Sequence, residues 1–115
     1  MKYMLLIYNN EAAMEEISKA DEEKTIAAYG AYTEAMTKAG VLVVANRLRP
    51  TSMASTVRVA NGKTEVLNGP YAETREQLGG FYMIEVPDLD GALAWAARCP
   101  GAAYGTIEVR PIWAM

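Results

Sequence analysis

Runs of apolar residues and the breaks between them predict the order of secondary structure along the chain. The first run, from Tyr3 to Tyr8, consists of β-favouring side chains and is too short to cross a membrane. Comparable runs follow three more times, each bounded by turn-forming residues. Strands are therefore predicted over residues 2–8, 41–48, 81–86 and 106–112.

Helix signals occur in two segments between these strands. The first helix is predicted to begin at Ser18 and to end near Gly40, and the second to begin with Asp88 or Asp90 as its N-cap and to end at residues 99–101. Spacings of three and four residues predict the buried side of each helix. These positions are Ile26, Tyr29, Thr33 and Met36 in the first helix, and Leu89, Leu93, Ala96 and Ala97 in the second.

A further pair of short strands is predicted in the middle of the chain. Asn61-Gly62 separates Ser55–Ala60 from Lys63–Leu67 and supplies the positive φ angles of a type I′ turn, which is typical of a β-hairpin. The order is then strand, helix, strand, hairpin, strand, helix, strand. Apart from the hairpin, this is the βαββαβ order of a ferredoxin-like α+β fold, here in a single domain of 115 residues.

Two of the predicted strands are apolar on both faces. The alternating sets are Tyr3, Leu5 and Ile7 against Met4, Leu6 and Tyr8, and Phe81 and Met83 against Tyr82, Ile84 and Val86. The helices of a ferredoxin-like fold cover only one face of the sheet, so something else has to cover the other. We expect a second copy of the chain there, in a symmetric homodimer that packs sheet against sheet.

Composition and charge exclude several classes of function. A net charge of −3 and the lack of any Lys/Arg cluster argue against nucleic-acid binding. The single cysteine, Cys99, excludes an internal disulfide and fits a cytoplasmic protein without a membrane partner. Histidine is absent, which excludes Ser–His–Asp triads and Cys–His dyads. We expect no cofactor and no metal site, since no metal-ligand spacing occurs.

The most distinctive stretch is NGPYAETREQLGGFYMIEV, residues 68–86. One interpretation is a solvated turn of helix between Pro70 and Gly79, in which Glu73 and Gln77 are neighbours. The other is a loop that places charged side chains on the rim of a pocket, as binding loops on rigid scaffolds do. The side chains in question are Glu73, Thr74 and Arg75. The Gly79-Gly80 pair predicts a bulge or a close backbone approach.

Arginines and tyrosines elsewhere provide further binding candidates. Guanidinium groups bind carboxylate or phosphate as bidentate forks, and phenol rings line aromatic pockets. The candidates are Arg47, Arg49, Arg58, Arg75 and Arg110, together with Tyr8, Tyr71, Tyr82 and Tyr104. The simpler alternative is a structural role: an ion pair for the arginines, and packing in the core or an interface for the tyrosines.

Residues 68–82 resemble the YCII-related proteins, in particular the branch named for its DGPF motif. The resemblance continues through MKYMLLIY, AAYGAYTEAM, VPDLDGALAWAARCP and IEVRPI. It implies a ferredoxin-like fold that dimerises into an α/β barrel-like assembly with a cleft between sheet and helices. For some members it also implies acid–base work by a His–Asp pair, and for the DGPF branch a functional link to extracytoplasmic-function sigma factors.

The sequence departs from this family motif at two positions. Asn68 stands where the motif has aspartate and Tyr71 where it has phenylalanine, and no histidine exists to complete a His–Asp pair. An amide cannot act as a general base, so chemistry that rests on that pair is not expected here. The residues that match the motif are Gly69, Pro70, Glu73, Thr74 and, as a basic position, Arg75.

The expected function is that of a small-molecule-binding or regulatory homodimer. Its binding candidates are Asn68, Tyr71, Glu73, Thr74, Arg75, Arg47 and Tyr8. The alternative is a cofactor-independent enzyme, lyase- or oxygenase-like, for a small substrate, aromatic ones included. It would use Glu73 or Tyr71 for acid–base work and Arg75 to hold an anion. Convergence of Glu73, Arg75 and a tyrosine in one cleft would favour the enzyme.

Overall fold

A computed structural model describes residues 1–114. The strands are β1 Lys2–Asn9, β2 Leu42–Arg47, β3 Ser55–Ala60, β4 Lys63–Asn68, β5 Gln77–Glu85 and β6 Thr106–Pro111. The helices are α1 Glu11–Glu15, α2 Lys19–Lys38 and α3 Leu89–Arg98, with the short 3-10 helices η1 Thr51–Met53 and η2 Pro100–Ala103. All the predicted elements are confirmed within a few residues, whereas α1 was not predicted.

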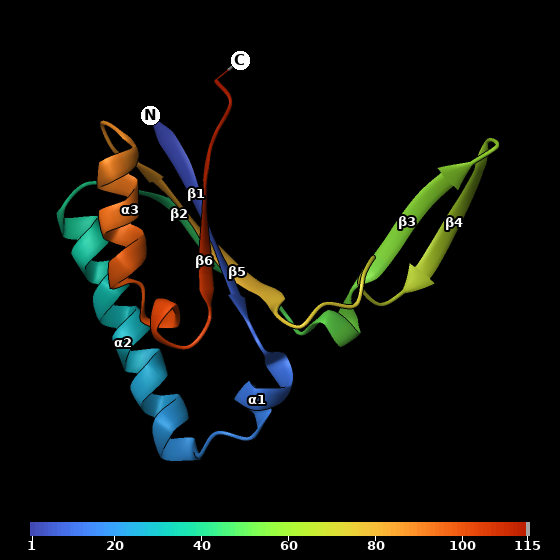
Figure 1. Cartoon of the computed structure of the whole chain (residues 1–115), viewed down its shortest axis with the longest axis horizontal. Coiled ribbons are helices and arrows are strands. Elements are labelled where there is room, and N and C mark those ends of the chain that lie inside the picture. The colour runs from blue at the N-terminus through green and yellow to red at the C-terminus, as the bar shows by residue number, and fades with distance from the viewer. Residues whose placement is uncertain (115) are drawn as a thin grey trace.

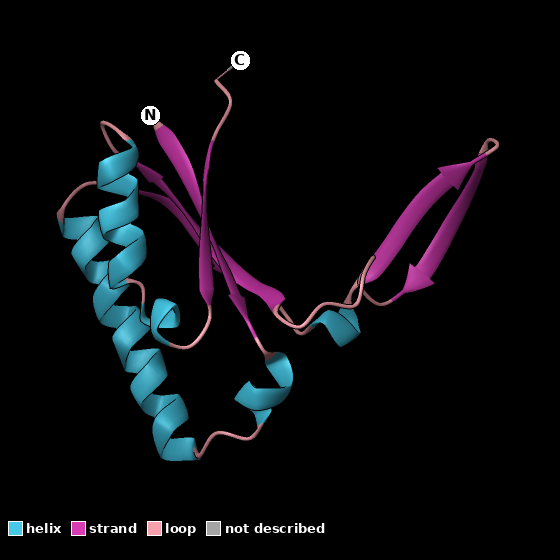
Figure 2. Cartoon of the chain, viewed as in Figure 1, coloured by secondary structure: helices cyan, strands magenta, loops and turns pink. Residues whose placement is uncertain are grey.

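The body of the molecule is a four-stranded antiparallel sheet with the order β2-β5-β1-β6. Helices α2 and α3 both lie against the same face of this sheet (Figures 1 and 2). This α+β arrangement is compatible with the ferredoxin-like fold that the element order predicts. Strands β3 and β4 form a separate two-stranded sheet, which occupies the connection between β2 and β5.

The β3–β4 hairpin projects from the body on the side of the sheet opposite to the helices (Figure 1). Its turn has the predicted geometry, with φ of 52° at Asn61 and 74° at Gly62, both in the left-handed region. The hairpin strands make their extensive contacts only with each other. The hairpin is therefore a structure of its own, attached to the body at its base.

The core lies between the sheet and the two long helices. Leu5, Met36 and Ile84 are fully buried there, one each from β1, α2 and β5. The Tyr32 ring meets the edge of the Tyr82 ring, with 5.2 Å between the ring centroids. The Tyr32 hydroxyl also donates a hydrogen bond of 2.6 Å to the main-chain oxygen of a residue in α3, Trp95. One side chain of α2 thus links the sheet to the second helix.

The predicted buried sides of the helices are partly wrong. On α2 the prediction is confirmed for Met36, which is fully buried, whereas Ile26 is 56% exposed and Tyr32, which was not predicted, is buried. Ile26 is exposed because the N-terminal half of α2 diverges from the sheet (Figure 1). On α3 the exposed residues are Leu89, Leu93 and Ala97, while Ala92 and Ala96 are buried. The alanines allow α3 to lie close to the sheet. The prediction chose the leucines because it ranked positions by hydrophobicity, and leucine is more hydrophobic than alanine.

The segment before β5 contains no helical turn, so the first interpretation of residues 70–79 is wrong. These residues form bends, and Gln77 already begins the strand. The prediction for the two glycines is confirmed. The register between β1 and β5 shifts at Gly79, and a Cβ atom on Gly80 would lie only 2.8 Å from the main-chain oxygen of Asn46.

The helix-free face of the sheet, here called the open face, is only partly shielded within one chain. Cross-strand pairing places Met4 opposite Met83 and Leu6 opposite Phe81 on this face, and all four side chains are half-buried. The β2 neighbour of Met83, Val44, is 38% exposed. The two-sided apolar pattern predicted from the sequence is therefore present in the folded sheet.

Truncating a fully buried side chain of β1 tests this description of the core. Leu5→Ala is expected to lower the free energy of unfolding by about 2–5 kcal/mol, since it leaves a cavity between the sheet and α2. Leu93→Ala makes the same chemical change at a 46% exposed position of α3, so it should cost less than about 1 kcal/mol. Urea denaturation followed by circular dichroism measures both. Equal losses would contradict the assignment of α3's buried side.

Candidate functional site

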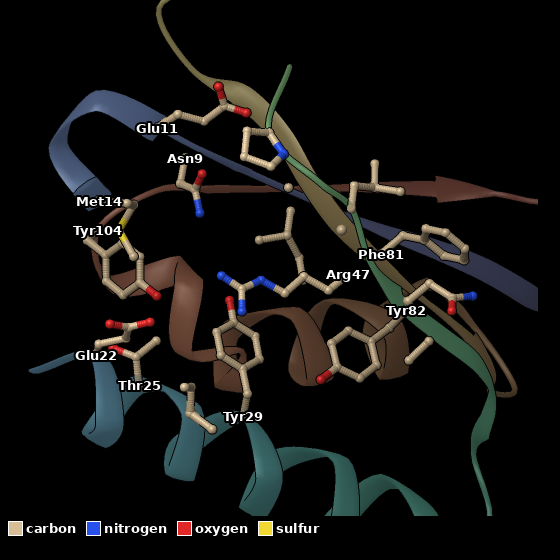
Figure 3. A pocket seen from close by; sticks show the side chains of 18 of the residues that line it. Asn9, Glu11, Met14, Glu22, Thr25, Tyr29, Arg47, Phe81, Tyr82 and Tyr104 are labelled. Atoms are coloured by element: carbon tan, nitrogen blue, oxygen red, sulfur yellow. The ribbon is translucent and has the colours of Figure 1, made fainter. Parts of the chain in front are cut away.

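A cavity of about 740 Å³ lies between the N-terminal half of α2, helix α1 and the helix-covered face of the sheet. Its α2 residues, from Glu22 to Thr33, belong mostly to the part of the helix that precedes the core residues Tyr32 and Met36. Figure 1 shows that this part of α2 diverges from the sheet. Figure 3 labels ten of its lining residues: Asn9, Glu11, Met14, Glu22, Thr25, Tyr29, Arg47, Phe81, Tyr82 and Tyr104. Phe81 only borders the cavity, because its side chain alternates with that of Tyr82 and lies on the open face. The lining combines apolar walls with a few polar groups, which is typical of small-molecule sites.

Arg47 provides a positive charge inside this cavity. It is the last residue of β2, and it pairs across the sheet with Gly80, which has no side chain to fill the space beside it. The guanidinium group points into the cavity, toward the side where Tyr29 and Tyr104 lie (Figure 3). Among residues 1–114 the ion pairs are Glu34–Lys38 and Glu108–Arg110, so Arg47 has no acidic partner within 4.0 Å.

Two tyrosines of the cavity, Tyr29 and Tyr82, have raised pKa values. Burial raises the pKa of Tyr29, and the neighbouring Cys99 and Tyr104 raise it further. Burial also raises the pKa of Tyr82, although the hydrogen bond with Thr33, 2.8 Å between the hydroxyl oxygens, works in the opposite direction. These phenols are therefore neutral hydrogen-bond donors rather than bases.

The unpredicted helix α1 provides one wall of the cavity and connects it to the hairpin. Asn10 caps the helix by accepting a hydrogen bond of 3.0 Å from the Ala13 amide, and this Asn-Glu start is the sequence signal that would have revealed it. The Glu11 carboxylate accepts two hydrogen bonds from Thr51, 2.9 Å from the amide and 2.7 Å from the hydroxyl. The Gln77 side chain accepts a hydrogen bond of 2.9 Å from the Glu11 amide.

Carboxylates of the helical side line the same cavity. Glu15 of α1 and Glu22 of α2 are both exposed and contribute to its wall. Figure 3 shows Glu22 beside Thr25 on α2, on the opposite wall from β2, which carries Arg47. The cavity therefore has a cationic group on the sheet side and anionic groups on the helix side.

Tyr8, one of the predicted binding residues, lies on the open face and not in the cavity. Its hydroxyl donates a hydrogen bond of 3.2 Å to Glu108 on the neighbouring β6. Burial raises the pKa of Tyr8, and the negative charge of Glu108 adds to this. The carboxyl of Glu108 is also paired with Arg110, which lowers its pKa. Arg110 thus forms an ion pair within its own strand.

The other predicted residues of the signature loop also lie outside the cavity. Asn68 ends β4 at the base of the hairpin. Tyr71, Glu73, Thr74 and Arg75 are exposed, and none of them lines the cavity. Of the seven predicted binding residues, Arg47 alone lies there, so the chain does not bring Glu73, Arg75 and a tyrosine together in it. Binding by the loop remains a prediction.

Sequence reasoning identified Tyr82 and Tyr104 as pocket tyrosines but assigned Tyr29 to a buried stripe. Thr25 and Tyr29 are one helical turn apart and are both half-buried, and both face the cavity. Their spacing was visible in the sequence. The divergence of α2 from the sheet, which creates the space in front of them, was not.

Comparison with known proteins identifies the family. A family model described as the YCII-related domain matches residues 1–115. The chain belongs to the YCII-related family. An uncharacterized protein of Rhizobium meliloti (strain 1021) is 40% identical to this YCII-related chain over 114 residues, which cover 97% of the chain and 92% of the relative. The resemblance noted in the sequence is therefore confirmed at the level of the family.

Two further observations on the YCII-related chain concern residues 1–114 only. No helix in this part is long and apolar enough to span a bilayer. No three Asp, Glu or Cys side chains gather there in a way that could hold a metal ion. The polar groups that line the cavity are a guanidinium, phenols, hydroxyls, amides and carboxylates.

Raised tyrosine pKa values make stability depend on alkaline pH. Tyr29, Tyr32 and Tyr82 have pKa values above the ordinary 10.0, mainly through burial, so the folded state holds these protons more tightly than the unfolded chain. Their contribution is complete below pH 10 and is lost as the pH rises above it. The free energy of unfolding should therefore fall between about pH 8 and about pH 11, and fall less in Tyr29→Phe. Denaturant titrations at both pH values measure this, and identical losses would contradict the burial of the Tyr29 hydroxyl.

Proposed function

We propose that this YCII-related protein binds a small organic anion, with a carboxylate held at Arg47. The observation that carries the proposal is the guanidinium of Arg47, which points into a cavity of about 740 Å³ without an acidic partner among the described residues. A guanidinium binds a carboxylate through two parallel hydrogen bonds, which fix the orientation of the bound group. Arg47 is exposed to solvent, so a ligand can reach it. The volume also lies within the usual range for ligand pockets, roughly 300–1,000 Å³.

The remaining walls define the rest of the ligand. Tyr29 remains protonated and is able to donate a hydrogen bond to a bound oxygen. Ile7, Ile17 and Ile26 add apolar surface, which suits a hydrocarbon or aromatic body attached to the carboxylate. Glu15 and Glu22 on the helical side would repel a second negative charge. The ligand class is therefore a monocarboxylate with an apolar body.

Binding is favoured over catalysis by where the loop residues lie. The enzyme alternative relies on Glu73 and Arg75, which lie outside the cavity. The raised pKa values of Tyr29 and Tyr82 make these two residues poor bases. The regulatory role, the link to a sigma factor, the DGPF branch and the cytoplasmic location remain predictions from the sequence. A carboxylate sensor would be compatible with any of them.

Substitution of Arg47 tests the anion site. Benzoate serves as the probe, and benzamide as its neutral isostere. Benzoate should raise the melting temperature of the wild-type protein, benzamide should not, and Arg47→Gln should weaken benzoate binding by about tenfold to a hundredfold through loss of a charge-assisted pair. Arg49→Gln removes the same charge two residues away, outside the cavity lining, and should leave binding unchanged. Thermal shift and calorimetry measure both.

Three outcomes would reject the anion site. Equal stabilisation by benzamide would show that charge is not recognised. Equal losses in the two arginine variants would show a general effect of charge rather than a site. If neither benzoate nor longer aliphatic monocarboxylates bind at millimolar concentration, the proposed ligand class is wrong.

We also propose that the protein is a homodimer in which the open faces of two copies meet. Met4, Leu6, Phe81 and Met83 form an apolar surface there, next to the partly exposed Val44. Monomeric proteins rarely leave so continuous an apolar patch in water. A two-fold axis would bury the same patch of both copies at once.

A charge on the open face tests the homodimer. Light scattering should give the wild-type protein about twice its chain mass of 12.5 kDa. Met4→Glu should produce a monomer, because the carboxylate would be buried between the two sheets. Leu93→Glu places the same charge on the exposed side of α3 and should leave the dimer intact. A wild-type monomer at micromolar concentration, or dissociation by both variants, would refute this interface.

A further inference from the structure

The β3–β4 hairpin, here called the arm, exposes an apolar face that nothing in its own chain covers. Cross-strand pairing places Val57 opposite Val66 and Val59 opposite Thr64 on one side of the arm. The three valines are 58%, 61% and 69% exposed, for Val57, Val66 and Val59 respectively. The other side carries Arg58 opposite Glu65, a pairing that suits water, with Leu67 opposite Thr56 nearer the base. The three valines therefore share one side of the arm, and its charged residues lie on the other.

An arm of this kind is not expected to be stable by itself. A single two-stranded hairpin is at best marginally stable in water, and β-branched side chains favour strands mainly when they pack against something. The arm also makes the chain unusually extended. Its radius of gyration is 16.1 Å, against about 13 Å for a compact chain of this length. Both facts indicate that the arm is completed by another molecule.

The base of the arm holds it in a defined direction. The Gly69 amide donates a hydrogen bond of 2.6 Å to the Ala54 oxygen, and the Thr56 hydroxyl donates one of 2.8 Å to the Gly69 oxygen. Just before the arm, Thr51 is bound by Glu11 of the body. The first two bonds close the base of the arm, and the bonds to Glu11 tie the segment that leads into it to the body.

We infer that the arm packs its valine side against a second copy of this chain. The arm projects on the same side of the sheet as the open face (Figure 1), so two copies that meet through their open faces each extend an arm over the other. The arm also carries Arg58 and Lys63 against one acid, Glu65, on the side away from the valines, whereas the chain as a whole has a net charge of −3. This net positive charge favours the approach of an arm to a partner's body, while the valines make the contact.

This inference rests on the proposed homodimer, but it adds a contact that the open faces alone do not require. It assigns the hairpin inserted between β2 and β5 as a clasp, which raises the stability of the dimer. It also explains why one side of the arm carries valines, which a contact between the open faces alone does not explain. The two contacts use different residues and can be tested separately.

The test compares two pairs of changes on opposite sides of the arm. The double variant Val57→Ser, Val66→Ser removes the apolar side, and it should weaken the dimer, measured as its dissociation constant by sedimentation, about tenfold or more. The double variant Arg58→Ser, Glu65→Ser changes the opposite side, keeps the net charge and should leave the dissociation constant within about twofold.

A chain that lacks the arm serves as a control, because the valine variant could weaken the dimer simply by unfolding the arm. Because Ala54 and Gly69 are hydrogen-bonded at its base, residues 55–68 can be replaced by an Asn-Gly turn with little strain. This shortened chain should keep the circular dichroism of the body and the benzoate response of the wild type, yet dimerise as weakly as the valine variant. If both arm variants dimerise like the wild type, the clasp is refuted while the open-face dimer stands. If the wild type itself is monomeric, both are refuted.

Discussion

One constraint organises this structure: the sheet is apolar on two faces, while its own helices cover only one. Tyr82 and Ile84 of β5 are buried against α2 and α3, whereas Phe81 and Met83, their neighbours in sequence, stay half-exposed on the other face. Period-two alternation makes this division unavoidable once the strand register is set. Apolar surface left in water carries a free-energy cost, so any contact that covers the open face would stabilise the protein.

The cavity depends on a second consequence of the same packing. Met36 and Tyr32 fix the C-terminal half of α2 on the sheet, while the N-terminal half of this 20-residue helix stands away from it and leaves a gap. The gap is not filled by large apolar side chains. It contains the polar end of Arg47, beside a glycine-rich stretch of β5. β2 ends in Arg47, and the residue paired with it on β5 is Gly80, which has no side chain. This pairing puts open space next to a positive charge.

The sequence predicted local structure well and tertiary placement less well. Ser18, Asp88 and the Asn61-Gly62 turn act through hydrogen bonds and φ angles within a few residues, so they could be recognised directly. The inward side of α3 and the divergence of α2 depend on how closely layers approach, which local spacing does not encode. The site shows the same limit, since only Arg47 of the seven predicted binding residues lines the cavity.

The hydrogen bonds between Glu11 and Thr51 have a consequence for how the protein responds to its surroundings. Glu11 and Pro50 both line the cavity, and Thr51 leads directly into the hairpin. A single carboxylate therefore joins the wall of the cavity to the root of the arm. In the proposed homodimer, any change in ligand affinity on assembly would be matched by an equal change in assembly on ligand binding. The concentrations of the protein and of the proposed ligand would then be two inputs to the same equilibrium.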